Sequence, residues 1–251
     1  MATRNPEKNQ PLLLRYVNNS YLISRVALVF NNMLRKFGVR IVADSSLVVL
    51  NDWVSRLLYF SRLFNLLEKV NGDIVECGVA DGGSQVIFAL LNRNFSSPRH
   101  IWGYDSFEGL PEPTKEDLES PKAIARKGMY PGSITNVLNN LKRAGMDEYY
   151  INKYITLVKG WFSDTLPKHR GSIAFLHVDG DLYESNKCVL ENLWQNVSIG
   201  GIVAFDDYLD QERFPGDRKA VDEFFTSYVK NDEVKMCKDY YYNRCYLIRL
   251  K

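Results

Sequence analysis

From residue 73 onward, short apolar runs typical of β-strands alternate regularly with stretches of helical periodicity. This alternation predicts a mostly parallel sheet with helices on both faces, because parallel strands are joined by crossover connections that are usually helical. Two final runs, 234–238 and 246–249, predict an antiparallel hairpin at the sheet edge. The fold class we expect is α/β. The strands expected before the hairpin are 73–77, 100–105, 154–159, 173–178 and 201–205.

The N-terminal part of the chain shows a different pattern. Apolar residues recur at near-helical spacing within 1–50, which favours short helices, and again through 52–70, which predicts an amphipathic helix. We therefore divide the chain into a helical extension, 1–50, and one large domain, 51–251. An extension of this kind covers a site as a lid or makes a subunit contact, and we expect a homo-oligomer.

Composition excludes several classes of protein. The formal charge is +2 with both signs interspersed, which gives no footprint for nucleic acid or an anionic membrane. The apolar stretch Tyr21–Phe30 is about half of the ~20 residues that a membrane span needs, and it contains Arg25. The four cysteines have no CxxC spacing and only three histidines are present, so we expect reduced thiols, a cytoplasmic location and no zinc site.

Two expected strands, 173–178 and 201–205, are each followed by a pair of carboxylates. Asp179 and Asp181 follow the first strand, and Asp206 and Asp207 follow the second. Because ligands of open α/β sheets bind at the carboxyl ends of the strands, we expect these acids to converge on one crevice. Converging carboxylates repel one another, whereas Mg²⁺ prefers such ligands. The alternative is that they are ordinary solvated acids in turns.

A glycine-rich turn, Glu76–Ser84, joins the first strand of the domain to its helix. Such a turn lets a ligand approach the backbone at the helix N-terminus. It is not a dinucleotide fingerprint, because Ala80 replaces the second glycine. The acids Glu76 and Asp81 suit a ligand with a cationic group, such as S-adenosylmethionine, better than a pyrophosphate. Asp105, at the end of the next strand, stands where an acid that binds ribose hydroxyls is expected.

Five motifs together resemble the macrocin O-methyltransferase family, which includes sugar methyltransferases of mycinamicin and novobiocin assembly. The resemblance covers about 70–250, and the first 50 residues match nothing we can place. Ala80-Asp81 departs from the bulky and basic pair that the family has in the glycine turn. The motifs are Val75–Ser84, Tyr104–Pro111, Gly160–Pro167, His177–Ser185 and Phe205–Tyr208.

The resemblance implies a class I methyltransferase (Rossmann-like) fold with a seven-stranded sheet and a sugar or glycosylated natural product as acceptor. It implies Mg²⁺ on Asp179, Asp206 and Asp207, with Asp181 as general base. The reverse assignment of Asp179 and Asp181 is the closest alternative. S-adenosylmethionine is expected to contact Glu76, Gly78, Gly82, Gly83, Ser84, Asp105, Ser106, Gly160, Trp161 and Asp179.

Other interpretations stay open at this stage. His177 is a second candidate base, although a histidine inside a strand favours a buried supporting role. A catechol-type phenol competes with sugars as acceptor, since both offer neighbouring oxygens to Mg²⁺. Asp179-Gly180-Asp181 also reads as the Asp-x-Asp of a metal-dependent glycosyltransferase, and a non-catalytic scaffold is a further alternative. Residues 106–132 are expected to form a long loop or lid, and Tyr183, Tyr208 and Phe214 are candidates for the acceptor wall.

Overall fold

The computed structural model describes residues 12–16, 39–43, 51–239 and 242–251. The chain separates into two units, Met1–Val54 and Ser55–Lys251. In the first unit, β1 (Leu12–Tyr16) and β2 (Val39–Ala43) pair in parallel. The expected short helices are therefore wrong for these two segments, because a five-residue apolar run does not distinguish strand from helix by periodicity. The rest of 1–50 lies outside the described residues.

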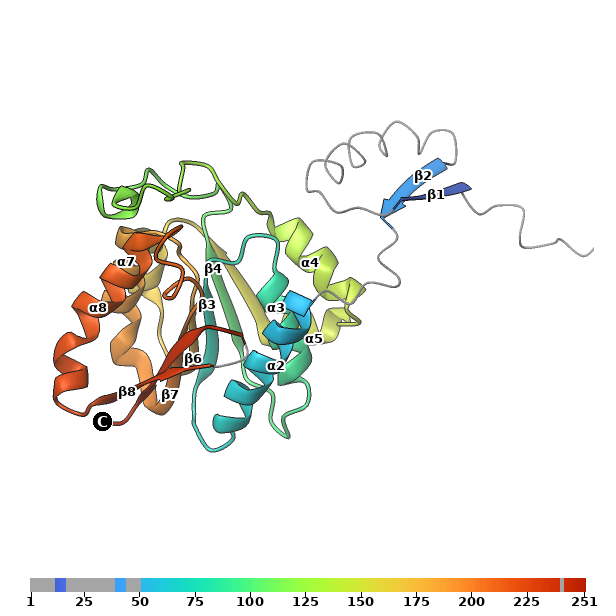
Figure 1. Ribbon diagram of the computed structural model, residues 1–251. Coiled ribbons are helices and arrows are strands. Elements are labelled where there is room, and N and C mark those ends of the chain that lie inside the picture. Colours follow the sequence, from blue (N-terminus) through green and yellow to red (C-terminus); the bar gives the residue numbers. More distant parts are fainter. Residues whose placement is uncertain (1–11, 17–38, 44–50, 240–241) are drawn as a thin grey trace, which may run out of the picture. The chain divides into compact units, whose positions relative to one another are not determined.

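The second unit is built on a seven-stranded sheet in the order β5-β4-β3-β6-β7-β9-β8 (Figure 1). Strands β3 to β7 run parallel, and β9 is antiparallel to both of its neighbours, β7 and β8. This confirms the predicted parallel sheet with a terminal hairpin. The strands are β3 (Asp73–Cys77), β4 (Ile101–Asp105), β5 (Ile155–Lys159), β6 (Ile173–Val178), β7 (Val197–Phe205), β8 (Val234–Lys238) and β9 (Cys245–Arg249).

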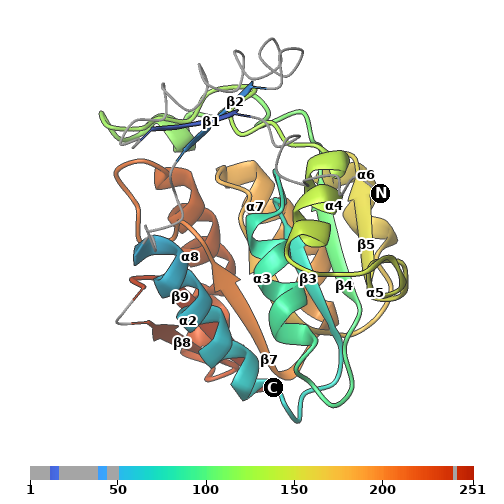
Figure 2. The ribbon, with the colours of Figure 1, turned by 90° about the vertical axis from the view of Figure 1, so that its right-hand side faces the viewer.

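Helices cover both faces of this sheet (Figures 1 and 2). Among the described residues, no helix is both long and apolar enough to cross a membrane. The helices are α2 (Asn51–Leu66), α3 (Gly83–Asn92), α4 (Ile134–Arg143), α5 (Glu148–Tyr154), α6 (Phe162–Thr165), α7 (Tyr183–Leu193) and α8 (Pro215–Lys230), with short 3₁₀ turns η3 (Glu116–Leu118), η4 (Leu166–Lys168) and η5 (Trp194–Asn196).

The central strands are buried on both faces, since neighbouring residues of a strand point to opposite sides. Ile74 of β3 packs into a core with α2, α3, α4 and α5, whereas Val75 packs into a second core with α7 and α8. The same alternation sends Phe175 and Leu176 of β6 into opposite cores. Both cores are continuous across the sheet, so the strand ends are held rigidly for the side chains that follow them.

The strand order reverses beside β3. The chain proceeds from β3 outward through β4 to β5, and then returns so that β6 lies on the other side of β3. Helices on the two sides of such a reversal diverge and leave a crevice at the carboxyl ends of the strands, which is where open α/β sheets bind ligands. The glycine-rich turn and the carboxylate pairs follow strands that meet at this point.

Candidate active site

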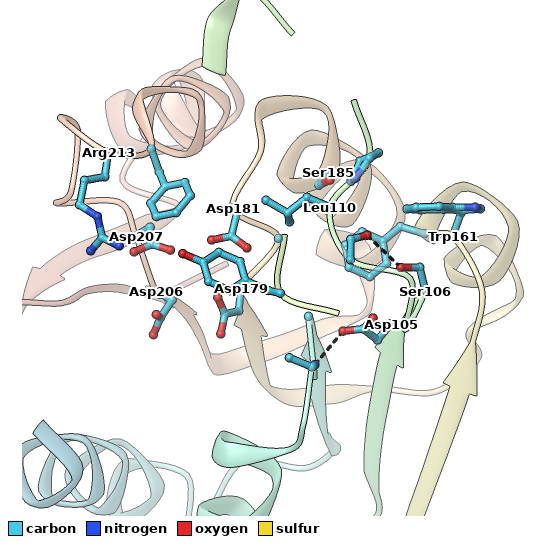
Figure 3. A pocket seen from close by; sticks show the side chains of 18 of the residues that line it. Asp105, Ser106, Leu110, Trp161, Asp179, Asp181, Ser185, Asp206, Asp207 and Arg213 are labelled. Atoms are coloured by element: carbon cyan, nitrogen blue, oxygen red, sulfur yellow. Dashed lines mark hydrogen bonds between the residues drawn. The ribbon is translucent and has the colours of Figure 1, made fainter. Parts of the chain in front are cut away.

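A cavity of about 400 Å³ lies at the carboxyl ends of β3, β4, β6 and β7 (Figure 3). Its lining is strongly charged. Asp105 and Trp161 lie at one end, and Asp207 and Arg213 at the other, with Asp179 and Asp181 between them. The expected convergence of acids from separate strands on one crevice is therefore present in the structure.

Three of the four predicted acids form a compact group. Asp179, Asp181 and Asp207 each offer one carboxylate oxygen, and these atoms lie within 4.8 Å of one another. Asp181 has a φ of 58°, a left-handed conformation that costs about 1 to 3 kcal/mol in a residue other than glycine. Gly180 makes the turn feasible, because an added Cβ would lie 2.5 Å from Asn186 Oδ1. The local backbone thus holds Asp181 in a conformation that brings it to the other two carboxylates.

The environment of this group disfavours its ionised form. Burial raises the pKa of Asp179 and of Asp181 well above the ordinary value of 3.8, and neighbouring carboxylates raise both further. Burial together with the charge of Asp206 raises the pKa of Asp207 to about 6. An all-oxygen donor set of mutually repelling acids suits a hard divalent cation. The residues present therefore fit Mg²⁺.

Asp206 has a different environment in the same cavity. Its Oδ1 lies 2.7 Å from Arg56 Nη2, and its Oδ2 lies 3.1 Å from Arg244 Nη2. Burial alone would raise the pKa of Asp206, but these arginines and His177 hold it below the ordinary value. Arg56 also donates to Tyr242 and to Ser84 Oγ. Asp206 is therefore ionised and already balanced by two guanidinium groups.

His177 lies beneath the cavity and does not line it. Its Nδ1 is 3.1 Å from Glu76 Oε1, and its Nε2 is 3.6 Å from Asp206 Oδ1. Burial lowers its pKa, but the surrounding acids Asp206, Glu76 and Asp179 together outweigh burial and raise the pKa to about 9. A protonated imidazole has no lone pair with which to accept a proton. The arrangement therefore favours a supporting role for His177 over that of a base.

Gly78 is the glycine of the turn that the geometry requires most strictly. Its φ is +100°, and an added Cβ would lie 1.8 Å from the carbonyl oxygen of Asp179. This close approach brings the turn after β3 against the carboxylate segment after β6. Of the residues expected to contact the cofactor, the cavity lining includes Gly78, Asp105, Ser106, Trp161 and Asp179. Glu76, Gly82, Gly83, Ser84 and Gly160 are not part of the lining.

Asp105 has a structural task in addition to its place on the cavity. One carboxylate oxygen accepts the backbone N–H groups of Val79 and Ala80, at 2.7 and 2.8 Å. The other accepts the N–H of Phe107. A carboxylate has about four lone-pair sites, so capacity for a ribose hydroxyl remains. The backbone of Asp105 also accepts from Gly160 N at 2.9 Å, which places Trp161 beside it.

The acceptor wall is only partly as expected. Phe214 lines the cavity, but Tyr183 and Tyr208 do not, because their hydroxyls donate to Glu223 and Asp222 on α8. The arginines of the lining gave no signal in the sequence, since isolated arginines form no recognisable spacing. These residues are Arg56, Arg213 and Arg244, whereas Leu110 and Tyr130 belong to the predicted loop 106–132.

The long loop, 106–132, is packed onto the domain and also contributes to the cavity. Asp117 of η3 is buried, and its carboxylate accepts Thr114 N–H and Oγ1–H as well as the N–H of Tyr183 at the start of α7. Ala125 packs against Phe214 and Leu182 in a small apolar cluster. The loop is thus fastened near its middle, while its two ends provide Leu110 and Tyr130 to the cavity.

Three features define the class I methyltransferase fold. They are a sheet whose strands are parallel except for β9, the second strand from one edge, a glycine-rich turn after β3, and a cavity where the strand order reverses. Two solved structures share it. NovP, an O-methyltransferase, is similar with a TM-score of 0.66 and 29% identity, over 79% of this chain and 81% of its own. CalS11, a calicheamicin methyltransferase, is similar in fold with a TM-score of 0.68 and 24% identity, over 93% and 95%.

Residues 52–238 match the family described as Macrocin-O-methyltransferase (TylF), and the chain belongs to this family. The 8-demethyl-8-(2,3-dimethoxy-alpha-L-rhamnosyl)-tetracenomycin-C 4'-O-methyltransferase of Streptomyces olivaceus is 36% identical over 57% of this chain. The demethyldecarbamoylnovobiocin O-methyltransferase of Streptomyces niveus is 33% identical over 66%, and the mycinamicin III 3''-O-methyltransferase of Micromonospora griseorubida is 32% identical over 67%. The matches span 55%, 63% and 66% of these relatives' own lengths.

Proposed function

We propose that this protein transfers a methyl group from S-adenosylmethionine to a hydroxyl of a sugar or a glycosylated natural product, with Mg²⁺ bound. The observation that carries the proposal is that two groups of residues line the same cavity. Asp105 and Trp161 lie at one end of it, opposite the carboxylate group of Asp179, Asp181 and Asp207. The relatives' names, all of which describe O-methyltransferases of natural products, support the acceptor class.

The donor is assigned to the end of the cavity formed by the glycine turn. Gly78 and Ala80 line this end, Asp105 keeps capacity to accept one ribose hydroxyl, and Trp161 offers an aromatic face. The sulfonium methyl group would then point toward the carboxylates in the middle of the cavity. A cationic sulfur is attracted to this acidic environment.

For the metal we propose Asp179 and Asp207 as ligands, with Asp206 as the third. Asp206 would then share its carboxylate with Arg56 and Arg244, which lie 2.7 and 3.1 Å from it. Asp181 is the other carboxylate within reach of the ion. Bound Mg²⁺ would orient neighbouring hydroxyls of the acceptor and lower their pKa.

Asp181 is proposed as the general base. It accepts the proton of the acceptor hydroxyl while that oxygen attacks the methyl carbon and the carbon–sulfur bond breaks, with the electron pair leaving on sulfur. Burial raises the pKa of Asp181, which makes its carboxylate a stronger base than an exposed aspartate. Its strained backbone fixes the carboxylate beside Asp207.

Calorimetry on the purified protein separates this function from the glycosyltransferase alternative. S-adenosylhomocysteine should bind in the presence of a chelator. Metal-dependent binding of uridine diphosphate without any binding of S-adenosylhomocysteine would overturn the methyltransferase assignment. A panel of glycosides and catechols, incubated with labelled S-adenosylmethionine and Mg²⁺, then identifies the acceptor. Methylation of catechols alone would move the function to phenols.

We also propose that the protein acts as a homo-oligomer. Leu57, Leu58 and Leu66 of α2 are 41%, 51% and 53% exposed, which leaves apolar surface on one helix. Light scattering coupled to size-exclusion chromatography tests this proposal. A monomer at all concentrations would contradict it.

A further inference from the structure

The three arginines of the cavity lining differ in what they contact. Arg56 and Arg244 both face Asp206, and their side chains are only 17% and 21% exposed. Their charges are balanced within the protein. Arg213 has a described ion pair only with Asp210, at 3.3 Å, three residues earlier in the same turn. Arg213 also shares a side-chain hydrogen bond with Tyr130 of the cavity lining. Because its side chain is 52% exposed, the pair with Asp210 contributes little, and the guanidinium keeps further N–H groups for a ligand.

Arg213 is nevertheless well positioned. Its backbone N–H donates to Asp210 and its carbonyl accepts from Ile124 of the long loop. The guanidinium lies 5.5 Å from the centre of the Phe214 ring, and Phe214 is buried. The position of the side chain is thus defined by a turn, an aromatic ring and the neighbouring loop.

Arg213 lies in the part of the cavity where the acceptor is expected to bind. Figure 3 shows it beside Asp207, across the carboxylate group from Asp105, Ser106 and Trp161. Leu110, Tyr130 and Phe214 add apolar surface to the lining. A molecule that places a hydroxyl at Asp181 and extends away from the donor therefore reaches a guanidinium group.

We propose that Arg213 is a specificity-determining residue that binds an anionic group of the acceptor, a carboxylate or a phosphate, near the hydroxyl that is methylated. The inference rests on the proposed function and narrows its substrate class. A neutral acceptor would gain only single hydrogen bonds from the guanidinium to its hydroxyl or carbonyl oxygens. A carboxylate or a phosphate, with two oxygens facing the guanidinium, gains a bidentate, charge-assisted pair, which Arg forms better than Lys. The carboxylate of a uronic acid and the diphosphate of a nucleotide sugar both supply this chemistry.

The test compares matched ligands for binding, with S-adenosylhomocysteine and Mg²⁺ present. The probes are phenyl β-D-glucuronide, phenyl β-D-glucoside and uridine diphosphate glucose. Wild-type protein should bind one anionic probe at least about 10-fold more tightly than the glucoside. In Arg213→Gln this preference should fall by about 10- to 100-fold, the range for a lost charge-assisted pair, and Arg213→Lys should lie between. Arg143→Gln, an exposed arginine of α4 outside the cavity, is the matched control and should keep the preference.

The outcomes distinguish the inference about Arg213 from the proposed methyltransferase function. Preference for the glucuronide identifies a carboxylate acceptor, and preference for the nucleotide sugar identifies a phosphate. Equal binding of all probes to wild-type protein, or an unchanged preference in Arg213→Gln, would overturn the inference even if neutral glycosides are methylated. If Arg213 governs anion binding but no sugar is methylated, the anion site at Arg213 stands and the proposed function fails.

Discussion

Magnesium should stabilise the fold by an amount that increases with pH, and the carboxylate group sets the size of the increase. Burial and Asp206 raise the pKa of Asp207 from 3.8 to about 6. Each pKa unit corresponds to about 1.4 kcal/mol, so ionised Asp207 costs the metal-free fold about 3 kcal/mol. Its carboxyl side chain is 11% exposed, which leaves little solvent screening.

The sign follows from which state binds the proton more tightly. Folded protein holds the Asp207 proton more strongly than unfolded protein, so this contribution to stability is complete below about pH 4 and is lost as pH rises through about 6. About 1.5 kcal/mol of it is lost between about pH 5 and about pH 7.5. The raised pKa values of Asp179 and Asp181 act in the same direction. A bound cation reverses the loss, because metal replaces the proton.

The assay is urea unfolding at these two pH values, in chelator and in excess Mg²⁺. The free energy of unfolding gained from Mg²⁺ should be at least about 1.5 kcal/mol larger at the higher pH. His177 loses stabilising protonation as pH rises toward 9, but this affects samples with and without metal and largely cancels in the difference. Asp207→Asn should lose the share of the increase that comes from Asp207, about 1.5 kcal/mol, whereas Glu191→Gln, on the exposed surface of α7, should keep the full increase. An increment that is equal at both pH values would refute the reasoning.

Four further substitutions test separate parts of the site. Asp181→Asn should lower kcat by about 10²- to 10⁴-fold and keep the affinity for Mg²⁺. Asp179→Asn should instead raise the Mg²⁺ concentration needed for half-maximal rate. The opposite pattern in metal titrations would mean that the two residues have exchanged roles. Gly78→Ala should lower the free energy of unfolding by more than about 3 kcal/mol, because its Cβ would lie 1.8 Å from a backbone oxygen, and unchanged urea stability would show that the turn relaxes. Asp117→Ala leaves the first N–H of α7 without its acceptor, so limited proteolysis within 106–132 should become faster; wild-type cutting rates would mean that the loop is held by its other contacts.

The fold was readable from the sequence where patterns are local. Strands 73–77 and 173–178 were predicted with their observed bounds, because apolar runs between turn residues define a buried strand. α5 was missed, although Asp147 caps it by accepting the N–H of Tyr150, since seven residues rich in tyrosine show no clear period. β7 begins at Val197, four residues before the predicted start at 201. The prediction was wrong because Gly200 and Gly201 are typical of a turn and concealed the first part of the strand.

The candidate site could be predicted only in part, because some of its contacts join residues that are far apart in the sequence. Strand ends locate Asp179, Asp181 and Asp207 without knowledge of tertiary packing. The pairing of Arg56 with Asp206 joins residues 150 positions apart, and no local spacing signals it. The motif resemblance predicts Glu76 as a cofactor contact. Its carboxylate lies against His177, and one oxygen lies within 4.8 Å of Asp179, which lines the cavity. The cofactor contact stays a prediction.

The central claim is methyl transfer to a sugar hydroxyl at the carboxylate group. The most direct measurement incubates wild-type protein, Asp181→Asn and a chelated sample with isotopically labelled S-adenosylmethionine and a panel of neutral and anionic glycosides, and reads products by mass spectrometry. We predict a labelled methyl ether on one sugar hydroxyl in the wild-type sample, and loss of that product both in chelator and in Asp181→Asn. A sugar methyl ether formed at the wild-type rate in chelator and in Asp181→Asn would contradict the account of the site, and labelled product on no glycoside would contradict the function.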